Sequence, residues 1–368
     1  MSDPRPVLLV TNFAPGFRVG AFAALHEREG IEVALVGGAV RHGGGTGDAT
    51  AALPFPAREV AQREVLTLAG SGRYRAVIAG MSGRVALPAA HRGARRARVP
   101  FVLWATMWAH PRTPPHVLSY LPTRHLYRDA DAIATYGPHV SAYVRGKGAR
   151  SPVVEAPQAV DTAFWTANAD APVRQSDYQA VFVGRLDGEK GLAVLTTAWR
   201  QSGLRASAAA LVLVGEGRFR APSFATSAVL SVGSRTREDV RDFYAGSDVV
   251  VVPSIPTRDF REPWGLVVNE AFHQCRPVIA THAVGAVAGG LVVHERNGLV
   301  VAPGDPDALA AALVRLHEDP ALRERLGRQG HEDVAPYTQA AWAAGMSRAL
   351  GAVGVARTDA PPRGVSLP

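Results

Sequence analysis

Short apolar runs alternate with longer amphipathic stretches along most of the chain. In the first half the strand candidates are Val7–Thr11, Val33–Val36, Ala76–Ala79, Phe101–Ala105 and Ala132–Thr135. The stretches between them predict helices at Gly20–Arg28, Ala57–Ala69, Ala86–Arg98 and Pro122–Ala130. Short strands that are apolar on both faces and separated by helices are typical of a doubly wound parallel sheet.

A change of composition between Ala156 and Ser176 marks a domain boundary, because this stretch is rich in Pro, Asp and Ala and has no long apolar period. We therefore expect a first α/β domain at residues 1–160 and a second at residues 161–336. The second domain predicts strands at Ala180–Val183, Ala210–Val214, Val229–Val232, Val249–Val252, Val278–Ala280 and Leu299–Val301. Its helices are expected around Gly191–Gln201, Arg237–Ala245, Val268–Gln274 and Asp307–Glu318.

The remaining segments have their own signatures. A C-terminal helix is expected within residues 337–352, at about Thr338–Leu350. The tail from 353 to 368 is rich in Pro, Arg and Gly and predicts disorder. The glycine-rich segment Gly43–Gly47 predicts a flexible loop.

Composition excludes several classes of protein. Hydrophobic residues make up 47% of the 368 residues, too many for a disordered chain. No apolar run approaches the roughly 20 residues of a membrane span, and the first residues do not have the pattern of a signal peptide. Cys275 is the only cysteine, which excludes disulfides within the chain and cysteine-based zinc sites. We expect a cytoplasmic protein in which Cys275 is a small buried side chain.

Positive charge is concentrated in the first half. The net charge is +8, and residues 1–160 contain 19 Lys and Arg against 10 Asp and Glu. The densest basic cluster consists of Arg84, His91, Arg92, Arg95, Arg96 and Arg98. Two interpretations remain open: a solvated basic helix, or a surface for an anionic partner, either a phosphate-bearing acceptor or an acidic bilayer. Nucleic acid is disfavoured because aromatic residues do not alternate with the charges. The sequence does not indicate an oligomeric state.

Two carboxylates stand out in the run from Arg261 to Ala280. Glu262 and Glu270 flank the short apolar stretch Leu266–Val268, which we interpret as strand-like. Ionised carboxylates only accept hydrogen bonds, so hydroxyl-rich molecules are natural neutral partners for such a pair. A sugar nucleotide has hydroxyl groups on both the ribose and the hexose.

A second candidate site follows the strand at Ala180–Val183. Gly184 would let the backbone approach a ligand closely, and Arg185 and Lys190 place two cations before a helix N-terminus. This arrangement suits a diphosphate. The alternative is an ordinary surface turn with a Lys–Glu pair. Lys190 is one of only two lysines in the chain.

Other loops at strand ends are candidates for the wall of the same site. Gly215 follows one strand, and Ser234 and Arg235 follow the next, where they could contact a nucleobase edge; for Arg235 an ordinary turn is the alternative. Gly16 lies in a loop after the first strand that resembles a phosphate-facing loop in shape. Ligands of doubly wound sheets bind at the carboxyl ends of the strands, so we expect the site in a cleft between the two domains.

Several of these motifs occur together in one family. From Tyr178 to about Ala343 the chain resembles the C-terminal domain of retaining glycosyltransferase family 4, which has the GT-B fold. The motifs stand in the family's order: VFVGRLDGEKGL, LVLVGEG, VGSRTREDVRDFYAGSDVVVVPS, EPWGLVVNEA, PVIATHAVG and NGLVVAPGDPDALAAAL. The first half is similar more weakly, in TNFAPGFRVGAFAAL, LYRDADAIATYG and APQAVDTAFW.

The resemblance implies a role for each matching residue. Glu270 would bind the ribose diol, and Glu262 would face the donor hexose and the reacting centre. Arg185 and Lys190 would bind the diphosphate and stabilise the charge that grows on the leaving group. Gly265, with the adjoining Leu266 and Val267, would lie against the donor sugar.

The resemblance also implies a reaction. The expected protein is a retaining, metal-independent enzyme that moves a hexose-type sugar from a nucleoside-diphosphate sugar to a hydroxyl acceptor. The acceptor is left open among a glycolipid, a polysaccharide and a small natural product. No Asp-x-Asp metal motif is present, and no cofactor is expected. Retention is expected to proceed by a front-face route in which the departing phosphate assists the acceptor.

Two positions depart from the family pattern, and two other functions remain. The family often has a histidine just after the strand at Phe101–Ala105, where this chain has Thr106, with His110 further on. His110 would serve the hexose or be an ordinary loop residue. The family usually has a glycine where Cys275 stands. The alternative functions are a sugar-nucleotide epimerase and a non-catalytic sugar-nucleotide-binding protein.

Overall fold

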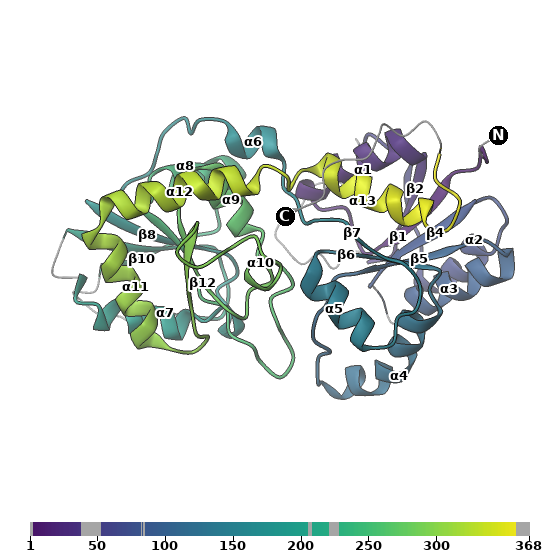
Figure 1. Ribbon diagram of the computed structural model, residues 1–368, viewed down its shortest axis with the longest axis horizontal. Helices are drawn as coiled ribbons and strands as arrows, with labels where there is room; N and C mark the ends of the chain where they lie inside the picture. Colours follow the sequence, from purple (N-terminus) through teal and green to yellow (C-terminus); the bar gives the residue numbers. More distant parts are fainter. Residues whose placement is uncertain are drawn as a thin grey trace. The chain divides into compact units, whose positions relative to one another are not determined.

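The apolar runs form two separate parallel β-sheets in the computed structural model, which describes residues 3–37, 53–81, 83, 85–204, 208–220 and 228–357. The chain divides into two units, residues 1–161 with 337–368, and residues 162–336. Each unit has its own sheet, and every strand pairs in parallel with its neighbours. Both units are therefore Rossmann-like α/β domains (Figure 1).

The first sheet has seven strands in the order β3-β2-β1-β4-β5-β6-β7. Their bounds are β1 Val7–Thr11, β2 Ile31–Leu35, β3 Ala57–Glu59, β4 Ala76–Gly80, β5 Phe101–Ala105, β6 Ala132–Thr135 and β7 Val153–Glu155. The helices of this unit are α1 Gly16–Glu29, α2 Val65–Ala69, α3 Ala86–Ala97, α4 Pro114–Asp129, α5 Pro138–Gly146 and α13 Gln339–Gly351. Helices α1 and α13 cover one face of the sheet, and α2 and α3 cover the other (Figure 1).

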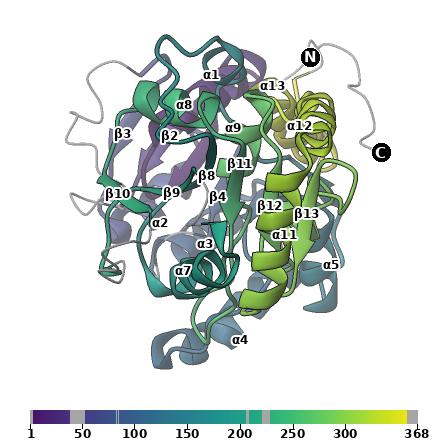
Figure 2. The same cartoon turned by 90° about the vertical axis from the view of Figure 1, so that its left-hand side faces the viewer.

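The second sheet has six strands in the order β10-β9-β8-β11-β12-β13. Their bounds are β8 Tyr178–Val183, β9 Ala209–Val214, β10 Val229–Gly233, β11 Val249–Val252, β12 Val278–Thr281 and β13 Gly298–Val301. Its helices are α6 Thr162–Thr166, α7 Leu192–Gln201, α8 Arg237–Ala245, α9 Val267–His273, α10 Gly285–Ala288, α11 Pro306–Glu318 and α12 Pro320–Val334. Figure 2 shows α7 and α11 side by side on one face, with α8, α9 and α12 on the other.

Local chemistry explains many of the boundaries. All four residues of β11 are valine, and β-branched side chains pack well on a sheet buried on both faces. The Thr236 side chain caps α8 by accepting the Asp239 N–H, while the Asp239 carboxylate accepts the Thr236 N–H. Asp305 and Thr338 cap α11 and α13 in the same way from their N-terminal ends.

Each sheet has a switch point next to the first strand of its unit. The strands that come next in the chain lie on one side of that first strand, and the later strands lie on its other side. In the second unit this point lies between β8 and β11. Loops that follow these two strands therefore diverge and leave room for a ligand at the carboxyl ends. The candidate residues from Gly184 to Lys190 follow β8, and Ser254 follows β11.

Some sequence-based expectations were wrong. The expected helix at Ala57–Ala69 begins as strand β3, because residues 57–59 pair with β2 at the edge of the sheet, and only Val65–Ala69 forms α2. The expected helix from Pro122 starts already at Pro114, with Pro122 inside it. The strand-like run Leu266–Val268 is instead the start of α9.

The C-terminal segment is also more ordered than expected as far as Arg357. Arg75 Nε donates to the carbonyl oxygen of Val355 over 2.9 Å, and the Arg357 backbone N–H donates to the Glu29 carboxylate over 3.1 Å. The buried side chains of Arg75 and Glu29 thus hold the segment that follows α13 against the rest of the first unit. The remainder of the expected disordered tail, residues 358–368, lies outside the described residues, as do the expected loop Gly43–Gly47 and Arg84.

Candidate functional site

Lys190 and Glu262 form an ion pair at the switch point of the second sheet. The Lys190 ammonium donates to Glu262 Oε2, and both side chains are largely buried. Ser254, two residues after the end of β11, donates its hydroxyl to the same carboxylate oxygen over 3.1 Å. The ammonium also lies 5.3 Å from the centre of the Phe260 ring. A cation and a carboxylate are thus held together at the edge of the sheet where ligands bind.

The backbone around this pair is closely packed. Ile255 N–H donates to the Glu189 carbonyl over 3.0 Å, which ties the loop after β11 to the loop after β8. Gly191 has φ 72°, and a Cβ atom there would lie 1.9 Å from the Pro253 carbonyl oxygen. Only glycine fits this junction, which positions Lys190 one residue earlier.

Gly265 lies beside Glu262. Its φ is 92°, and a Cβ atom at this position would lie 3.0 Å from Val284 and 3.8 Å from the Cγ atom of Glu262. Leu266 stands at the N-cap position of α9 without a capping side-chain hydrogen bond, and Val267 is the first residue of that helix. The donor-binding candidates Gly265, Leu266 and Val267 therefore form the turn that leads from Glu262 into α9.

Glu270 has a separate set of contacts on α9. Its Oε2 atom accepts the Tyr244 hydroxyl of α8 over 2.8 Å. The residue keeps part of its surface, but enclosure of the carboxyl group raises its pKa to about 7, against smaller opposing effects of the Tyr244 hydroxyl and the Arg237 charge. Burial, together with Glu270, raises the pKa of Tyr244 well above its ordinary value, so this hydroxyl remains a donor.

Arg185 is oriented differently from Lys190. Its guanidinium donates to Asp187 over 2.5 Å and to Glu189 over 2.9 Å, both in its own loop, and 53% of its side chain is exposed. Arg185 therefore pairs within its own loop, whereas the Lys–Glu pair of the alternative is absent from the described contacts of this turn, because Lys190 pairs with Glu262. A diphosphate would compete with two carboxylates for this side chain.

Three glycines at adjacent strand ends line up along the sheet. Gly184 N–H donates to the Val214 carbonyl, and Gly215 N–H donates to the Gly233 carbonyl over 2.9 Å. A Cβ atom on Gly215, whose φ is 136°, would lie 1.9 Å from the Gly184 carbonyl oxygen. A hollow of about 560 Å³ lies here, lined by Leu186, Gly215, Glu216, Gly217, Phe219, Arg220, Ser231 and Gly233.

The remaining candidates of the second unit lie on its surface. Ser234 and Arg235 are both exposed just beyond β10, and the Arg235 guanidinium donates only to the adjacent Ser234 carbonyl among the described contacts. In the sequence they directly follow Gly233, which lines the hollow of about 560 Å³.

His110 and Gly16 belong to the first unit. His110 Nε2 lies 2.6 Å from the His116 carbonyl oxygen, and its ring packs against Tyr120 of α4 at 5.1 Å. Gly16 is the first residue of α1, and a Cβ atom there would meet open space. Trp104, at the end of β5, is buried against Phe22, Tyr136 and Trp342.

Cys275 is exposed, which contradicts the expectation of a buried side chain. Helix α9 ends at His273, and the chain turns at Cys275 with φ 53° to enter β12. This left-handed conformation explains why the family usually has glycine here. The thiol lies at a second hollow, of about 420 Å³, lined by Asp248, Arg276, Pro277, Pro320, Arg323, Glu324 and Arg328.

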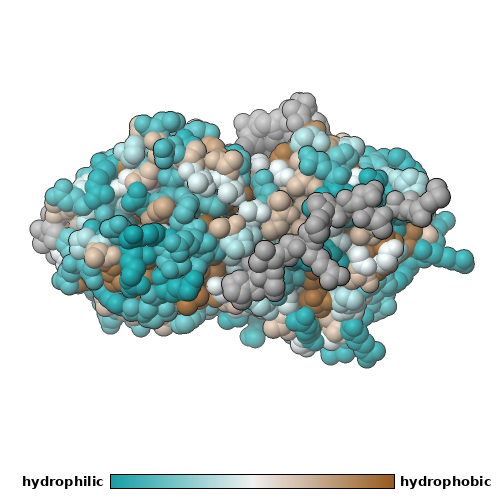
Figure 3. Space-filling model, turned by 45° about the horizontal axis from the view of Figure 1, so that its top comes forward, coloured by the Kyte–Doolittle hydropathy of each residue, from teal (hydrophilic) through white to brown (hydrophobic). Residues whose placement is uncertain are grey.

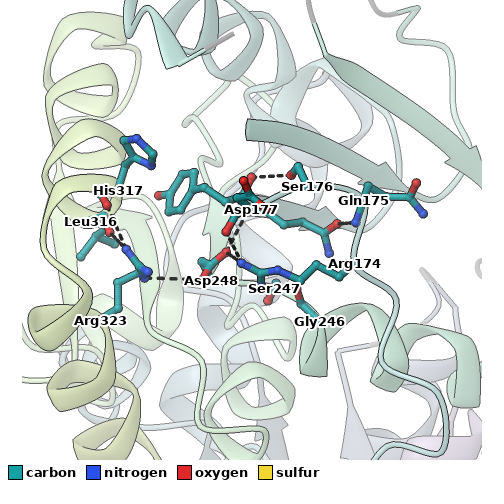
Figure 4. A network of polar contacts seen from close by, with 12 residues as sticks. Arg174, Gln175, Ser176, Asp177, Gly246, Ser247, Asp248, Leu316, His317 and Arg323 are labelled. Atoms are coloured by element: carbon teal, nitrogen blue, oxygen red, sulfur yellow. Dashed lines mark hydrogen bonds and ion pairs between the residues drawn. The ribbon is translucent and has the colours of Figure 1, made fainter. Parts of the chain in front are cut away.

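The amino ends of the strands around this second hollow carry a structural network of charges. The Asp248 carboxylate accepts hydrogen bonds from the Arg174 guanidinium over 2.9 Å and from the Gln179 backbone N–H over 2.8 Å (Figure 4). The same carboxylate lies 3.5 Å from the Arg323 guanidinium. Arg323 also donates to the carbonyl oxygen of His317 at the end of α11. The network joins α12 to the start of β11 and lies at the edge of the sheet opposite the candidate site.

Sequence reasoning missed two residues of the candidate site, Ser254 and Tyr244. Ser254 had a usable signal, because it is the first polar residue after a buried strand at the switch point. Tyr244 had none, since it lies within α8 and reaches Glu270 only through the packing of α8 and α9. Among the described residues, no group of three His, Cys, Asp or Glu side chains could hold a metal ion.

The second unit resembles known glycosyltransferases in sequence. Residues 177–319 match the family model described as "Glycosyl transferases group 1". Two relatives are the lipopolysaccharide core biosynthesis glycosyltransferases LpsE and LpsD of Rhizobium meliloti, 34% and 30% identical over 179 and 218 residues. The matches cover 47% and 56% of this chain and 48% and 59% of those proteins. The chain thus spans about half the length of the curated relatives it matches.

The fold is shared with solved structures over nearly the whole chain. The crystal structure of Anabaena HepE in complex with UDP and glucose aligns with a TM-score of 0.73 at 18% identity, covering 94% of this chain and 99% of that chain. The two parallel sheets with these neighbours define a GT-B fold.

Proposed function

We propose that the protein is a glycosyltransferase that moves a hexose-type sugar from a nucleoside-diphosphate sugar to a hydroxyl acceptor with retention of configuration and without a metal ion. The observation that carries the proposal is the Lys190–Glu262 pair at the switch point of a domain that matches the glycosyl transferases group 1 model. It provides a buried cation and an acceptor of hydroxyl groups within one loop cluster.

In the proposed reaction each charged group has one task. The Lys190 ammonium would move from Glu262 to the diphosphate and stabilise the negative charge that forms as the bond to the sugar breaks. The freed Glu262 carboxylate would accept hydrogen bonds from the hexose hydroxyls. The acceptor proton would go to the departing phosphate oxygen on the same face of the sugar, which gives retention. Glu262 is not assigned as a nucleophile.

The nucleotide would be held further along the sheet. The ionised Glu270 carboxylate would accept hydrogen bonds from the two ribose hydroxyls. Each such charge-assisted hydrogen bond contributes roughly 1.5–3 kcal/mol. The hollow beside Gly215 and Gly233 is a suitable place for the base. Anabaena HepE was crystallised with UDP and with UDP-glucose, which favours a UDP-sugar as donor.

The class of the acceptor is inferred from the names of two relatives. The names of LpsE and LpsD favour a glycolipid over a polysaccharide or a small natural product. No described helix is long and apolar enough to cross a bilayer.

Product analysis tests the proposal against its alternatives. UDP-glucose is incubated with the protein, with and without a panel of lipid and sugar acceptors, in buffer containing EDTA. The proposal expects acceptor-dependent release of UDP and an α-linked product despite EDTA. A change of the donor sugar without acceptor would indicate an epimerase. UDP binding without turnover across the panel would indicate a non-catalytic binding protein.

A further inference from the structure

Helix α4 exposes three large aliphatic side chains on one side. Val117, Leu118 and Leu121 are 59%, 81% and 69% exposed. Their spacing of one and three residues places them on adjoining positions of a helical surface. The other exposed large hydrophobic residues of the described chain are scattered: Leu66 on α2, Val85 before α3, Leu230 on β10 and Val293 in a loop. The face drawn in Figure 3 likewise shows brown residues only in small groups among teal ones.

The first half of α4 contributes little to the core of its unit. Among the residues of the helix whose burial is described, Leu126 is the first buried one, and those before it are exposed or partly exposed. This half is anchored through His116 and Tyr120, which hold His110. Three exposed aliphatic residues therefore do not serve the folding of the unit, and a grouped apolar surface of this kind usually marks a contact site.

Positive charge surrounds the apolar residues. Arg112 precedes the helix, and Arg128 near its C-terminal end is exposed. The only acidic residue of α4 is Asp129, which is already bound by His91 at 2.7 Å and Arg95 at 3.3 Å. Helix α3 contacts α4 and contains three arginines and no acidic residue.

We propose that α4 docks the protein on the surface of an anionic lipid bilayer. Val117, Leu118 and Leu121 would enter the boundary between headgroups and acyl chains, and Arg112 and Arg128 would lie at the lipid phosphates. A bilayer offers apolar and anionic groups together. A second copy of this chain is disfavoured as the occupant, because two arginine-rich surfaces would repel each other.

The docked helix lies next to the loop of a candidate site residue. His110 is held by the backbone of His116, one residue before Val117. Docking would therefore bring the carboxyl end of β5, which this loop follows, close to the lipid surface. The docking itself does not depend on the proposed reaction.

Vesicle binding tests the proposal with the full-length protein. Flotation with vesicles of phosphatidylcholine mixed with phosphatidylglycerol should recover the wild-type protein, and pure phosphatidylcholine vesicles should recover much less. The Leu118→Glu/Leu121→Glu variant should lose at least about tenfold in binding, since each leucine loses its apolar contact. The Leu230→Glu/Val293→Glu variant, with two exposed hydrophobic residues of the other unit replaced, should bind as the wild type does.

A second measurement separates insertion from simple charge attraction. Leu118→Trp should show a blue-shifted fluorescence maximum on addition of the anionic vesicles, and high salt should weaken binding of all variants. Circular dichroism spectra equal to the wild type would show that the exposed substitutions leave the fold intact. Absence of wild-type binding, or equal binding by the Leu118→Glu/Leu121→Glu variant, overturns the proposal. Self-association abolished by that variant, without vesicle binding, would assign the surface to a second copy.

Discussion

At the scale of single residues, the second domain holds one buried cation next to one buried carboxylate. Lys190 and Glu262 are each other's partner in the absence of a ligand, and Ser254 supports the carboxylate. A substrate with both an anionic group and hydroxyl groups could contact each member of this pair.

Replacing Lys190 by Met should reduce the rate of sugar transfer by about a hundredfold, because a single donor to the developing charge contributes a factor of that order. The affinity for the intact donor should fall less. Single-turnover transfer and calorimetric titration of the donor measure the two quantities. Arg218→Ala is the matched control, since Arg218 is near the same loop but 91% exposed, and it should change the rate by less than about twofold. Equal losses of rate in both variants would contradict the assignment.

Glu270 should make donor binding depend on pH near neutrality. Its pKa is about 7 in the folded protein, so the ionised carboxylate that accepts the ribose hydroxyls forms as the pH rises. Affinity for a UDP-sugar should increase about tenfold between roughly pH 6 and 8. The Glu270→Gln variant should bind more weakly and show no such increase. A wild-type affinity that is constant over this range would count against the role of Glu270.

The same raised pKa has an opposite effect on stability. The folded protein holds the Glu270 proton more tightly than the unfolded chain does. The protonated Glu270 carboxyl group therefore stabilises the fold at pH values below its ordinary pKa of 4.5. This stabilisation falls as the pH rises towards 7 and is absent above that pH.

At the scale of elements, the strand ends of the second sheet depend on glycine. Gly215→Ala should lower the free energy of unfolding by more than about 2 kcal/mol, because its Cβ would collide with the Gly184 carbonyl at 1.9 Å. Gly233→Ala is the control: its φ of 75° also disfavours alanine, but a Cβ there would meet open space. It should cost only about 1 kcal/mol. Urea denaturation of both variants measures the difference, and equal costs would show that the close approach is relieved by movement of the backbone.

Element positions were predictable where periodicity was clear. Buried strands such as Phe101–Ala105 and Val249–Val252 were located correctly, because four or five consecutive apolar residues leave few alternatives. The edge strand β3, with residues Ala57, Arg58 and Glu59, has no such pattern and is defined by pairing with β2. The run Leu266–Val268 was wrongly interpreted as strand-like for a related reason. A three-residue apolar run fits a strand or a helix until packing decides.

At the scale of the whole molecule, distant parts of the chain meet in the first unit. Arg75 donates to Glu29 at the end of α1 over 2.7 Å, to the Arg5 carbonyl and to the Val355 carbonyl. Arg75 and Glu29 are almost fully buried. One buried ion pair thus connects the N-terminal segment, α1, the start of β4 and the segment after α13.

Breaking this pair should destabilise the fold strongly. Arg75→Met or Glu29→Gln alone should lower the free energy of unfolding by about 3–5 kcal/mol, because each leaves a buried group without its charged partner. The double variant should cost clearly less than the sum of the two. Urea denaturation followed by circular dichroism measures the cycle. Additive single costs would mean that the two side chains stabilise the fold independently.

The sequence by itself determined the two parallel sheets, and it singled out the charged candidate residues of the second domain. These features depend on local periodicity and on motifs a few residues long. Only the tertiary structure decided that Lys190 binds Glu262, that Arg185 binds its own loop, that Tyr244 reaches Glu270 and that Leu118 is exposed. Apart from the local contacts of Arg185, these depend on which loops and helices meet after folding, and contacts between residues far apart in the chain leave no periodic trace in the sequence. The direction of the Arg185 side chain is set by the folded conformation of its loop.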